Sequence, residues 1–503
     1  MMQFGVIKDY INGQWVEQLP DRQMDVFNPS TGKVIARIHS TPDSEVAEAI
    51  AAAAAAFKTW GKTSLGSRMD YLFKLHSELK SRREELAQVI AIDQAKHISD
   101  ARGEVDRAIQ LTGTACGIPL LMRGNKFPIA SQVDGEVVKE PVGVVGALAP
   151  FNFPALVFGW FVPFAIGCGN TLVYKASELS PVFMQKIAEI LAAIQLPPGV
   201  FNLVNGDSAV GEVLLQSPRV QAMTFVGSTG VGSIVAQASA NTGKKSMVLA
   251  GAKNTSIVLE DVNYDGFIDN IINACYGAAG QRCMATSNIA IVESVYDEVK
   301  ARLVTASQQV KVGDACDPNV YMGPLISRSA LNKAHRYIDT ALAEGGKLVL
   351  DGRGIAVGEA NQDGYFIGPT IIEGVTAEMT LAKEEVFAPV VALIKIKDLN
   401  EGIAIINDSV YGNGGTVYTE SGAYAHQFLA ETNSGMLGVN IGVPAAMPYL
   451  PFGGTKGSLL GSQMKAQGAE AVEFFTKNKV ATVRYYGYNG AAAKGASGCC
   501  TLK

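Results

Sequence analysis

The stretch VGVVGALAPFNFPALVFGWFVPFAIGCGNTLVYKASELSP, residues 142–181, decides the fold class. Short apolar runs at 142–149 and 170–177 flank a longer apolar segment, a pattern typical of a strand, a helix and a second strand. Strands joined in this way form a right-handed crossover and lie parallel in one sheet. The middle segment is too apolar for a surface helix, but Pro154 and Pro163 interrupt it short of the ~20 residues that a membrane span needs. We therefore expect a buried helix on a parallel sheet, and no membrane contact.

The same alternation extends in both directions from this stretch. Further strand-like runs at 199–206, 222–229 and 246–260 complete one series. A second series of strands and helices begins with the strand-like run at 287–294 and ends with the one at 435–441. Strands alternating with helices predict mostly parallel sheets covered on both faces. We predict an α/β fold with two such domains.

The remaining segments predict helices, arms and a tail. Helices are expected at 41–60 and, with many charges, at 77–94. Strand-like alternation at 131–142 and 479–488 predicts projecting arms. The last residues, 489–503, are rich in Gly and Ala and predict a flexible tail. Its Cys-Thr-Leu-Lys ending, which contains Cys500, is a poor prenylation signal, so lipidation is disfavoured.

Composition excludes several classes of partner. The 503 residues carry 42 basic and 47 acidic side chains, a net charge of -5, with no basic stripe for a phosphate backbone. Nucleic acid is therefore not an expected partner. The seven cysteines are an odd number without a C-x-x-C pair, which argues against a disulfide framework or a zinc ribbon. The N-terminus lacks a signal or transit pattern, so a reducing, cytoplasmic location is expected.

Cys283 is the candidate nucleophile. It lies in GQRCMATS, residues 280–287, beside Arg282. A thiol near a fixed cation ionises more readily and is then a strong nucleophile. Most free cysteines are nevertheless buried and inert, and the local sequence leaves both readings open. The scattered histidines disfavour a Cys-His hydrolase and a histidine metal site. They are His39, His76, His97, His335 and His426.

Two further motifs suit ligands at the carboxyl edge of the first predicted sheet. Asn152, in APFNFP, follows a predicted strand and could donate to a developing oxyanion, although a turn-forming Asn is the simpler reading. GSTGVG spans Gly227 to Gly232 at a helix start, which suits a pyrophosphate on helix N–H groups. It lacks the G-x-G-x-x-G fingerprint, so an ordinary strand-to-helix turn stays open.

The motifs together carry a resemblance. APFNFP, GNTLVYKASELSP, FVGSTGVG, GAAGQRC, KEEVFAPV and LPFGGTKGS follow one another across nearly the whole chain. This set resembles the NAD(P)-dependent aldehyde dehydrogenase superfamily. The resemblance implies a Rossmann-like NAD-binding domain, an α/β catalytic domain and a small β oligomerisation arm, in a homodimer or homotetramer. The implied boundaries are 1–122 and 142–252 for NAD binding, 253–455 for catalysis, and 123–141 and 456–488 for the arm and C-terminal strand region.

The resemblance also implies roles for single residues. Cys283 attacks the aldehyde, and Asn152 with the Cys283 backbone N–H forms the oxyanion hole. The implied cofactor contacts are Phe151, Lys175, Glu178, Gly211, Gly227, Ser228, Glu385 and Phe387. Glu178 favours NAD, because a carboxylate accepts both ribose hydroxyls but repels the 2′-phosphate of NADP.

The stretch MVLAGAKN, residues 247–254, decides which acyl acceptor is expected. Hydrolytic members of the superfamily carry a water-activating glutamate here, whereas this chain has no Asp or Glu between Glu212 and Glu260. With NIGVP and GAEAVEFFTKNKVATVR, the stretch resembles the CoA-acylating methylmalonate- and malonate-semialdehyde dehydrogenases. That branch implies CoA as co-substrate and loss of CO2, giving propionyl-CoA or acetyl-CoA.

A semialdehyde that carries a carboxylate needs a cation. Arg107 matches an arginine of that branch, and Arg282 lies beside the nucleophile; either could bind the carboxylate. Arg107 could instead pair with Glu104 on a helix surface. A CoA-independent dehydrogenase that releases a carboxylic acid, and a non-catalytic relative that serves as a structural or binding protein, stay open as alternatives.

Overall fold

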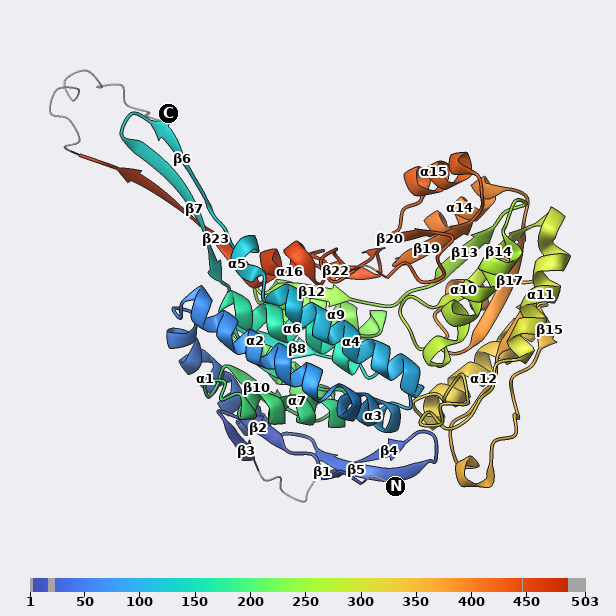
Figure 1. Cartoon of the computed structure of the whole chain (residues 1–503), viewed down its shortest axis with the longest axis horizontal. Helices are drawn as coiled ribbons and strands as arrows, with labels where there is room; N and C mark the ends of the chain where they lie inside the picture. The colour runs from blue at the N-terminus through green and yellow to red at the C-terminus, as the bar shows by residue number, and fades with distance from the viewer. Residues whose placement is uncertain (1–2, 17–22, 446, 487–503) are drawn as a thin grey trace.

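The computed structural model describes residues 3–16, 23–445 and 447–486. Figure 1 shows two α/β halves side by side and a narrow β arm that projects from the first half. The predicted tail at 489–503, with Cys500, lies outside the described residues. The predicted α/β class with mostly parallel sheets is confirmed.

The first sheet has the order β22-β12-β11-β8-β9-β10-β2-β3. Neighbours from β12 to β10 are parallel, while β22, β2 and β3 add antiparallel edges. Its strands are β2 (Asp9–Ile11), β3 (Gln14–Val16), β8 (Val144–Leu148), β9 (Thr171–Lys175), β10 (Phe201–Val204), β11 (Val220–Val226), β12 (Lys245–Leu249) and β22 (Leu459–Gly461). Because β8 lies between β11 and β9, the segments that follow these three strands meet at one edge of the sheet.

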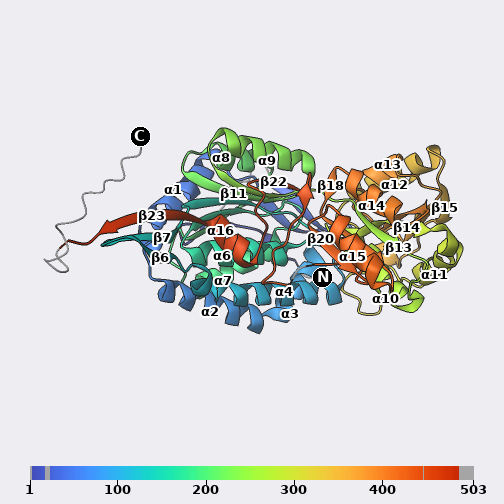
Figure 2. The ribbon, with the colours of Figure 1, turned by 90° about the horizontal axis from the view of Figure 1, so that it is seen from above.

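Helices cover both faces of this sheet. On one face, α1 (Asp43–Trp60), α8 (Ser208–Gln216) and α9 (Thr229–Asn241) contact the strands. On the other face, α6 (Pro154–Cys168) and α7 (Val182–Ala193) contact the strands, and a further layer covers them, as Figures 1 and 2 show. That layer comprises α2 (Leu65–Ser81), α3 (Arg83–Asp93), α4 (Ile98–Ala115) and α16 (Gly468–Phe475).

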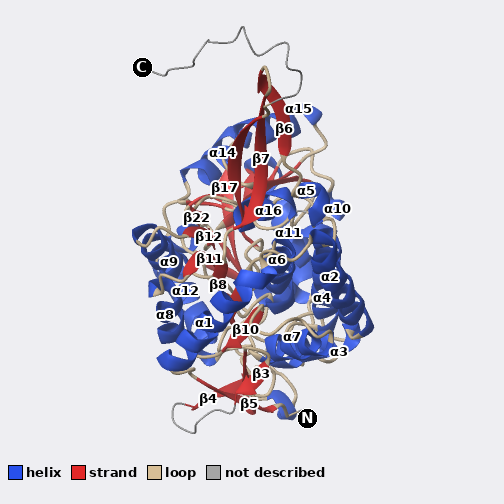
Figure 3. Ribbon diagram, turned by 90° about the vertical axis from the view of Figure 1, so that its left-hand side faces the viewer, coloured by secondary structure: helices blue, strands red, loops and turns tan. Residues whose placement is uncertain are grey.

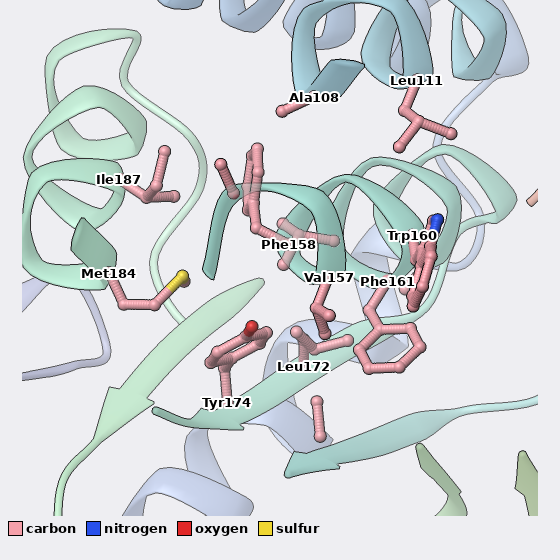
Figure 4. Packing of buried hydrophobic residues seen from close by; sticks show 14 of the residues in the cluster. Ala108, Leu111, Val157, Phe158, Trp160, Phe161, Leu172, Tyr174, Met184 and Ile187 are labelled. Atoms are coloured by element: carbon pink, nitrogen blue, oxygen red, sulfur yellow. The ribbon is translucent and has the colours of Figure 1, made fainter. Parts of the chain in front are cut away.

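Helix α6 is the predicted buried helix. Nearly every residue along it is buried, as expected for a helix that is apolar on all sides. Figure 4 shows its side chains between α4 above and β9 below. A Cβ at Gly159 would lie 2.9 Å from Leu111 Cδ1, so a glycine here lets α4 approach closely. None of the helices in the described part of the chain is both long and apolar enough to cross a membrane.

The second sheet has the order β15-β16-β17-β14-β13-β19-β20, parallel except at β15. Its strands are β13 (Asn254–Val258), β14 (Thr286–Val292), β15 (Lys347–Leu350), β16 (Thr370–Glu373), β17 (Val390–Ile396), β19 (Gly414–Tyr418) and β20 (Met436–Val439). The helices around it are α10 (Tyr264–Tyr276), α11 (Tyr296–Gln308), α12 (Arg328–Ala343), α13 (Thr380–Lys383), α14 (Leu399–Asp408) and α15 (Gly422–Glu431).

The arm consists of β6 (Asn125–Ala130), β7 (Val133–Pro141) and β23 (Thr476–Arg484), paired antiparallel in the order β23-β7-β6. Figure 3 shows these strands extending beyond the helices. The strand-like alternation at 131–142 and 479–488 thus predicted two of the strands that form the arm.

Smaller elements complete the fold. They are β1 (Gly5–Val6), β4 (Gln23–Asn28) and β5 (Lys33–His39) in one small sheet, β18 (Tyr411–Gly412) paired with β21 (Thr455–Lys456), and the short helix α5 (Ile118–Leu121).

The prediction of one continuous helix at 77–94 is wrong. The structure divides this segment between α2 and α3, because Arg82 leaves the helical region with φ -100° and ψ 16°. The break lets α3 contact α7 as well as α4.

Phe158 tests how far the fold depends on α6. Its fully buried ring packs edge-to-face on Phe183, with 6.3 Å between the centroids. We expect Phe158→Ala to lower the free energy of unfolding by about 3–5 kcal/mol, because it leaves a cavity. Denaturant unfolding followed by circular dichroism measures this. Phe73→Ala, at a ring that is 58% exposed, is the control; equal losses in both variants would contradict the prediction.

Candidate active site

A tight turn of the backbone positions Cys283. The turn Gly277–Gly280 follows α10, and Ala278, Ala279 and Gly280 have φ of 50°, 54° and 69°. Left-handed backbone in consecutive alanines is strained and needs support from its surroundings. Asp100 of α4 supplies part of it, because its Oδ2 accepts the Ala278 N–H at 3.0 Å.

The backbone carbonyl of Cys283 is held by two amides. Asn254 Nδ2 and Asn413 Nδ2 each donate to it at 2.8 Å. Asn254 begins β13 and Asn413 directly precedes β19, and these strands are neighbours in the second sheet. The thiol is therefore presented from the edge of that sheet.

Asn152 comes from the first sheet and meets the loop that carries the thiol. It lies between β8 and α6, is 6% exposed, and donates from Nδ2 to the Gln281 carbonyl at 3.0 Å. An amide nitrogen carries two hydrogens, so one remains for another acceptor. The structure thus brings Asn152 next to the Cys283 loop.

The surroundings of Cys283 oppose ionisation. Burial, and next the Glu385 carboxylate, raise the pKa of the thiol to about 12, although the backbone N–H groups of Cys283 and Met284 and the Arg282 charge lower it. A cavity of about 20 Å³ is lined by both Cys283 and Glu385. The thiol is therefore mostly protonated at neutral pH in the free protein.

The expected cofactor contacts gather at the carboxyl edge of the first sheet. Lys175 ends β9, and its Nζ pairs with Glu178 Oε2 at 2.9 Å. Gly227 follows β11, and Ser228 is the residue immediately before α9. Gly211 lies on α8, where an added Cβ would be 3.6 Å from the Leu148 side chain of β8.

Glu385 and Phe387 approach this edge from the second sheet, in the segment between α13 and β17. Glu385 Oε1 accepts the Ala252 N–H at 3.1 Å. Phe387 has φ 62°, a strained value for an aromatic residue, and its ring packs edge-to-face on Phe151, with centroids 6.0 Å apart. Phe151 and Phe387 therefore join the two halves beside Cys283.

The two candidate arginines, Arg107 and Arg282, differ in the side chains that they contact. Arg282 is 13% exposed, and its guanidinium contacts Asp100 at 3.0 Å and Asn273 Oδ1 at 2.9 Å. Arg107 is half-buried on α4, where its Nη1 lies 3.8 Å from Met447 Sδ. The pairing of Arg107 with Glu104 is not formed, because Glu104 is buried and pairs with Lys96.

Reasoning from sequence missed three residues beside the site: Lys96, Asp100 and Glu104. Each contacts a loop that carries Asn152 or Cys283. Asp100 and Glu104 share one face of α4, because they are four residues apart. The four-residue spacing could have indicated that both carboxylates face the same neighbour, but nothing in the local sequence indicated that they contact the Asn152 and Cys283 loops.

The protonated state of Cys283 can be measured by alkylation with neutral iodoacetamide. We expect the rate in the free protein to rise about tenfold per pH unit from about pH 7 to 10 without a plateau, because only the thiolate reacts. Glu385→Gln should raise the rate severalfold at each pH, since it removes a negative charge next to the thiol. Mass spectrometry of the Cys283 peptide gives the rate.

The matched control for this measurement is Glu384→Gln. Glu384 is the neighbouring carboxylate, but it hydrogen-bonds the Tyr337 hydroxyl. A plateau below about pH 9, or an equal increase from both substitutions, would contradict the assigned cause.

Comparison with known proteins gives the chain a family. Residues 15–481 match the Aldehyde dehydrogenase family. The malonate-semialdehyde dehydrogenase of Halalkalibacterium halodurans is 41% identical over 480 residues, which cover 95% of this chain and 98% of that protein. Malonate-semialdehyde dehydrogenase 2 of Geobacillus kaustophilus is 42% identical, covering 95% of this chain and 99% of that protein.

Solved structures agree with these relatives. The methylmalonate-semialdehyde dehydrogenase of Oceanimonas doudoroffii has a TM-score of 0.93 and 36% identity, covering 96% of this chain and 99% of that one. The betaine aldehyde dehydrogenase of Staphylococcus aureus, in complex with NAD+, has a TM-score of 0.91 and 28% identity, covering 97% and 96%. The resemblance stated from the motifs is therefore confirmed, and this chain belongs to the aldehyde dehydrogenase family.

Proposed function

We propose that this chain oxidises malonate or methylmalonate semialdehyde with NAD and transfers the acyl group to CoA. The observation that carries the choice of acceptor is the acid-free stretch beside the thiol. Within residues 213–259, Asn254 contacts the Cys283 backbone, and Ala252 and Asn254 line the same cavity as the thiol. Neither side chain can activate water as a general base. Glu385, the carboxylate that also lines this cavity, accepts the Ala252 N–H and is the residue that we assign to the cofactor. A thiol acceptor needs no such base, because it ionises much more readily than water.

The donor set supports NAD as the cofactor. The start of α9 at Ser228 and Thr229 offers N–H groups to a pyrophosphate, and Glu178 offers a carboxylate to ribose hydroxyls. An added Cβ at Gly251 would come within 2.9 Å of Glu385 Oε2, so the glycine keeps the backbone close to that carboxylate. When bound, NAD supplies the acceptor for the hydride that leaves the aldehyde carbon.

The chain's own residues then have the following roles. Cys283 first loses its thiol proton to solvent, and the resulting thiolate adds to the aldehyde carbon. Asn152 Nδ2 with the Cys283 N–H holds the developing oxyanion. Oxidation leaves the acyl group on Cys283 as a thioester. The CoA thiolate attacks that thioester and Cys283 leaves as a thiolate. The β-carboxylate is lost as CO2, and a proton from solvent takes its place on the α-carbon. The cofactor is oriented by eight residues at the carboxyl edge of the first sheet and in the segment before β17. They are Phe151, Lys175, Glu178, Gly211, Gly227, Ser228, Glu385 and Phe387.

NADH formation with and without CoA tests this proposal. With malonate or methylmalonate semialdehyde, we expect slow turnover without CoA and at least about tenfold faster turnover with it, because the thioester accumulates until a thiol removes it. Mass spectrometry identifies the acyl-CoA product, and propanal serves as the comparison aldehyde.

Cys283→Ser is the control, and it should abolish both the acyl adduct and NADH formation. Fast turnover without CoA that CoA leaves unchanged would instead support a hydrolytic aldehyde dehydrogenase. No NADH with any aldehyde would support a non-catalytic relative.

Arg107 is the side chain that we propose for the substrate carboxylate. Residues 100, 104 and 107 share one face of α4, and Asp100 and Glu104 both contact loops of the site. Arg282 already contacts Asp100 and Asn273, so its contribution is mainly the local positive charge near the thiol.

Arg107→Leu tests this assignment. We expect the KM for malonate semialdehyde to rise about 10–100-fold, through loss of a charge-assisted contact, while kinetics with propanal change little. Arg102→Leu removes an exposed arginine of the same helix that pairs with Glu84 at 2.7 Å, and it is the matched control. An equal rise in KM for propanal would contradict a role in binding the carboxylate.

We also propose that the arm joins copies of this chain into a homodimer or homotetramer. Phe127, Ile129, Val138 and Val480 of β6, β7 and β23 are each 47–72% exposed, an apolar surface of the kind that a second copy covers. A cytoplasmic location is supported by the described cysteines, which are all free thiols.

A further inference from the structure

We infer that Lys96 and Glu104 are positioning residues that set the geometry of the oxyanion hole through Asn152. The inference rests on the roles proposed above for Asn152 and Cys283. The proposed mechanism gives this buried ion pair no contact with substrate or cofactor.

Lys96 precedes α4, and its side chain is 1% exposed. Its Nζ makes three contacts. It forms an ion pair with Glu104 Oε2, donates to the Asn152 backbone carbonyl at 2.7 Å, and lies 3.6 Å from the centroid of the Phe153 ring. A charged donor in so dry a site holds its acceptor strongly. Lys96 therefore holds the backbone of the residue that provides the oxyanion donor.

Glu104 anchors the other end of the same loop. Its Oε1 accepts the Ala155 N–H at 2.7 Å and the Leu156 N–H at 3.1 Å, both in the first turn of α6. A carboxylate at a helix N-terminus satisfies donors that have no partner within the helix and interacts favourably with the helix dipole. The loop between β8 and α6 is thus held at Asn152 by Lys96 and at Ala155 by Glu104.

These contacts hold the backbone from which the Asn152 amide projects. Lys96 holds the Asn152 backbone carbonyl, and the side chain donates one Nδ2 hydrogen to the Gln281 carbonyl, so the second Nδ2 hydrogen has little freedom. An oxyanion donor is effective only at about 2.7–3.1 Å from the position where charge develops. A misplacement of about 1 Å can lower the rate about 100-fold.

The thiol loop is held by the same helix, one turn earlier. Asp100 accepts the Ala278 N–H and pairs with Arg282, so α4 contacts both loops through Asp100 and Glu104. The nearby charges of Lys96, Arg282, Asp100 and Glu104 balance. Removing Lys96 alone would leave Glu104 buried without its counter-ion, which is strongly destabilising.

The double variant Lys96→Met/Glu104→Gln avoids that problem. Gln keeps an oxygen acceptor for α6, Met keeps the volume of the lysine stem, and both charges are removed together. We expect kcat to fall about 10–100-fold, with the KM values for the semialdehyde and NAD within about threefold. Cys283 alkylation should stay within about twofold, because the thiol loop is held by Asp100 instead.

The decisive measurement repeats this substitution in an Asn152→Ala background. Asn152→Ala alone should lower kcat about 100–1000-fold. Since the pair acts through the Asn152 amide, adding Lys96→Met/Glu104→Gln should then lower kcat by less than about twofold. A merely structural ion pair would lower kcat by the same factor in both backgrounds, and that result, or full kcat in the double variant, would overturn the inference.

Two further variants keep the test interpretable. Lys300→Met/Glu373→Gln removes a partly buried pair, 2.9 Å apart and remote from the site, and should leave kcat unchanged. If the Lys96/Glu104 double variant does not fold, Glu104→Asp, which keeps the counter-ion of Lys96 but draws the carboxylate back from the α6 N–H groups, carries the same comparison in both backgrounds. Full NADH formation by Cys283→Ser would refute the proposed function itself, whereas loss of activity there with additive losses at Lys96 and Glu104 would refute only this inference.

Discussion

The hydrogen bond from the Asn152 amide to the Gln281 carbonyl joins the two halves of the molecule at the candidate site. It requires the end of β8 to meet the loop after α10, and these segments belong to different sheets. Each of these two segments is supported by an element outside the sheets: helix α6 supports the segment after β8, and the turn Gly277–Gly280 supports the loop that carries Cys283. The fully buried helix α6 fixes the direction in which the chain leaves Asn152, and the left-handed turn before Cys283 fixes where the thiol emerges.

Helix α4 connects these supports. Its apolar face packs on α6, where Gly159 allows close approach to Leu111. Its Glu104 accepts a backbone N–H at the start of α6, and its Asp100 accepts one in the turn that follows α10. A helix that contacts both loops couples the positions of Cys283 and Asn152, because moving the helix would move both. Such coupling is the condition for a pre-organised site, in which the donor waits where charge will develop.

The electrostatic surroundings of Cys283 favour the protonated thiol over the thiolate that reacts. Burial and Glu385 raise the pKa of Cys283, which favours the protonated thiol in the free protein. The acid-free stretch 213–259 adds no carboxylate to the cavity beside the thiol, and Glu385, which also lines that cavity, is the residue proposed to orient the cofactor. The absence of an acid in that stretch favours a site in which the thioester persists until a thiol acceptor arrives.

The sequence by itself determined the α/β class, two of the three arm strands and the nucleophile candidate, because each depends on residue type and local spacing. The missing base followed from comparing the acid-free stretch 213–259 with the family that the motifs resemble. It left Asn152 open between a turn residue and an oxyanion donor, and only the family resemblance favoured the donor role. It did not reveal that Lys96 and Glu104 hold Asn152, nor that Asp100 engages Arg282. Only the tertiary structure decided those partnerships, because they join residues from separate segments and depend on burial, which determines how strongly two charges interact.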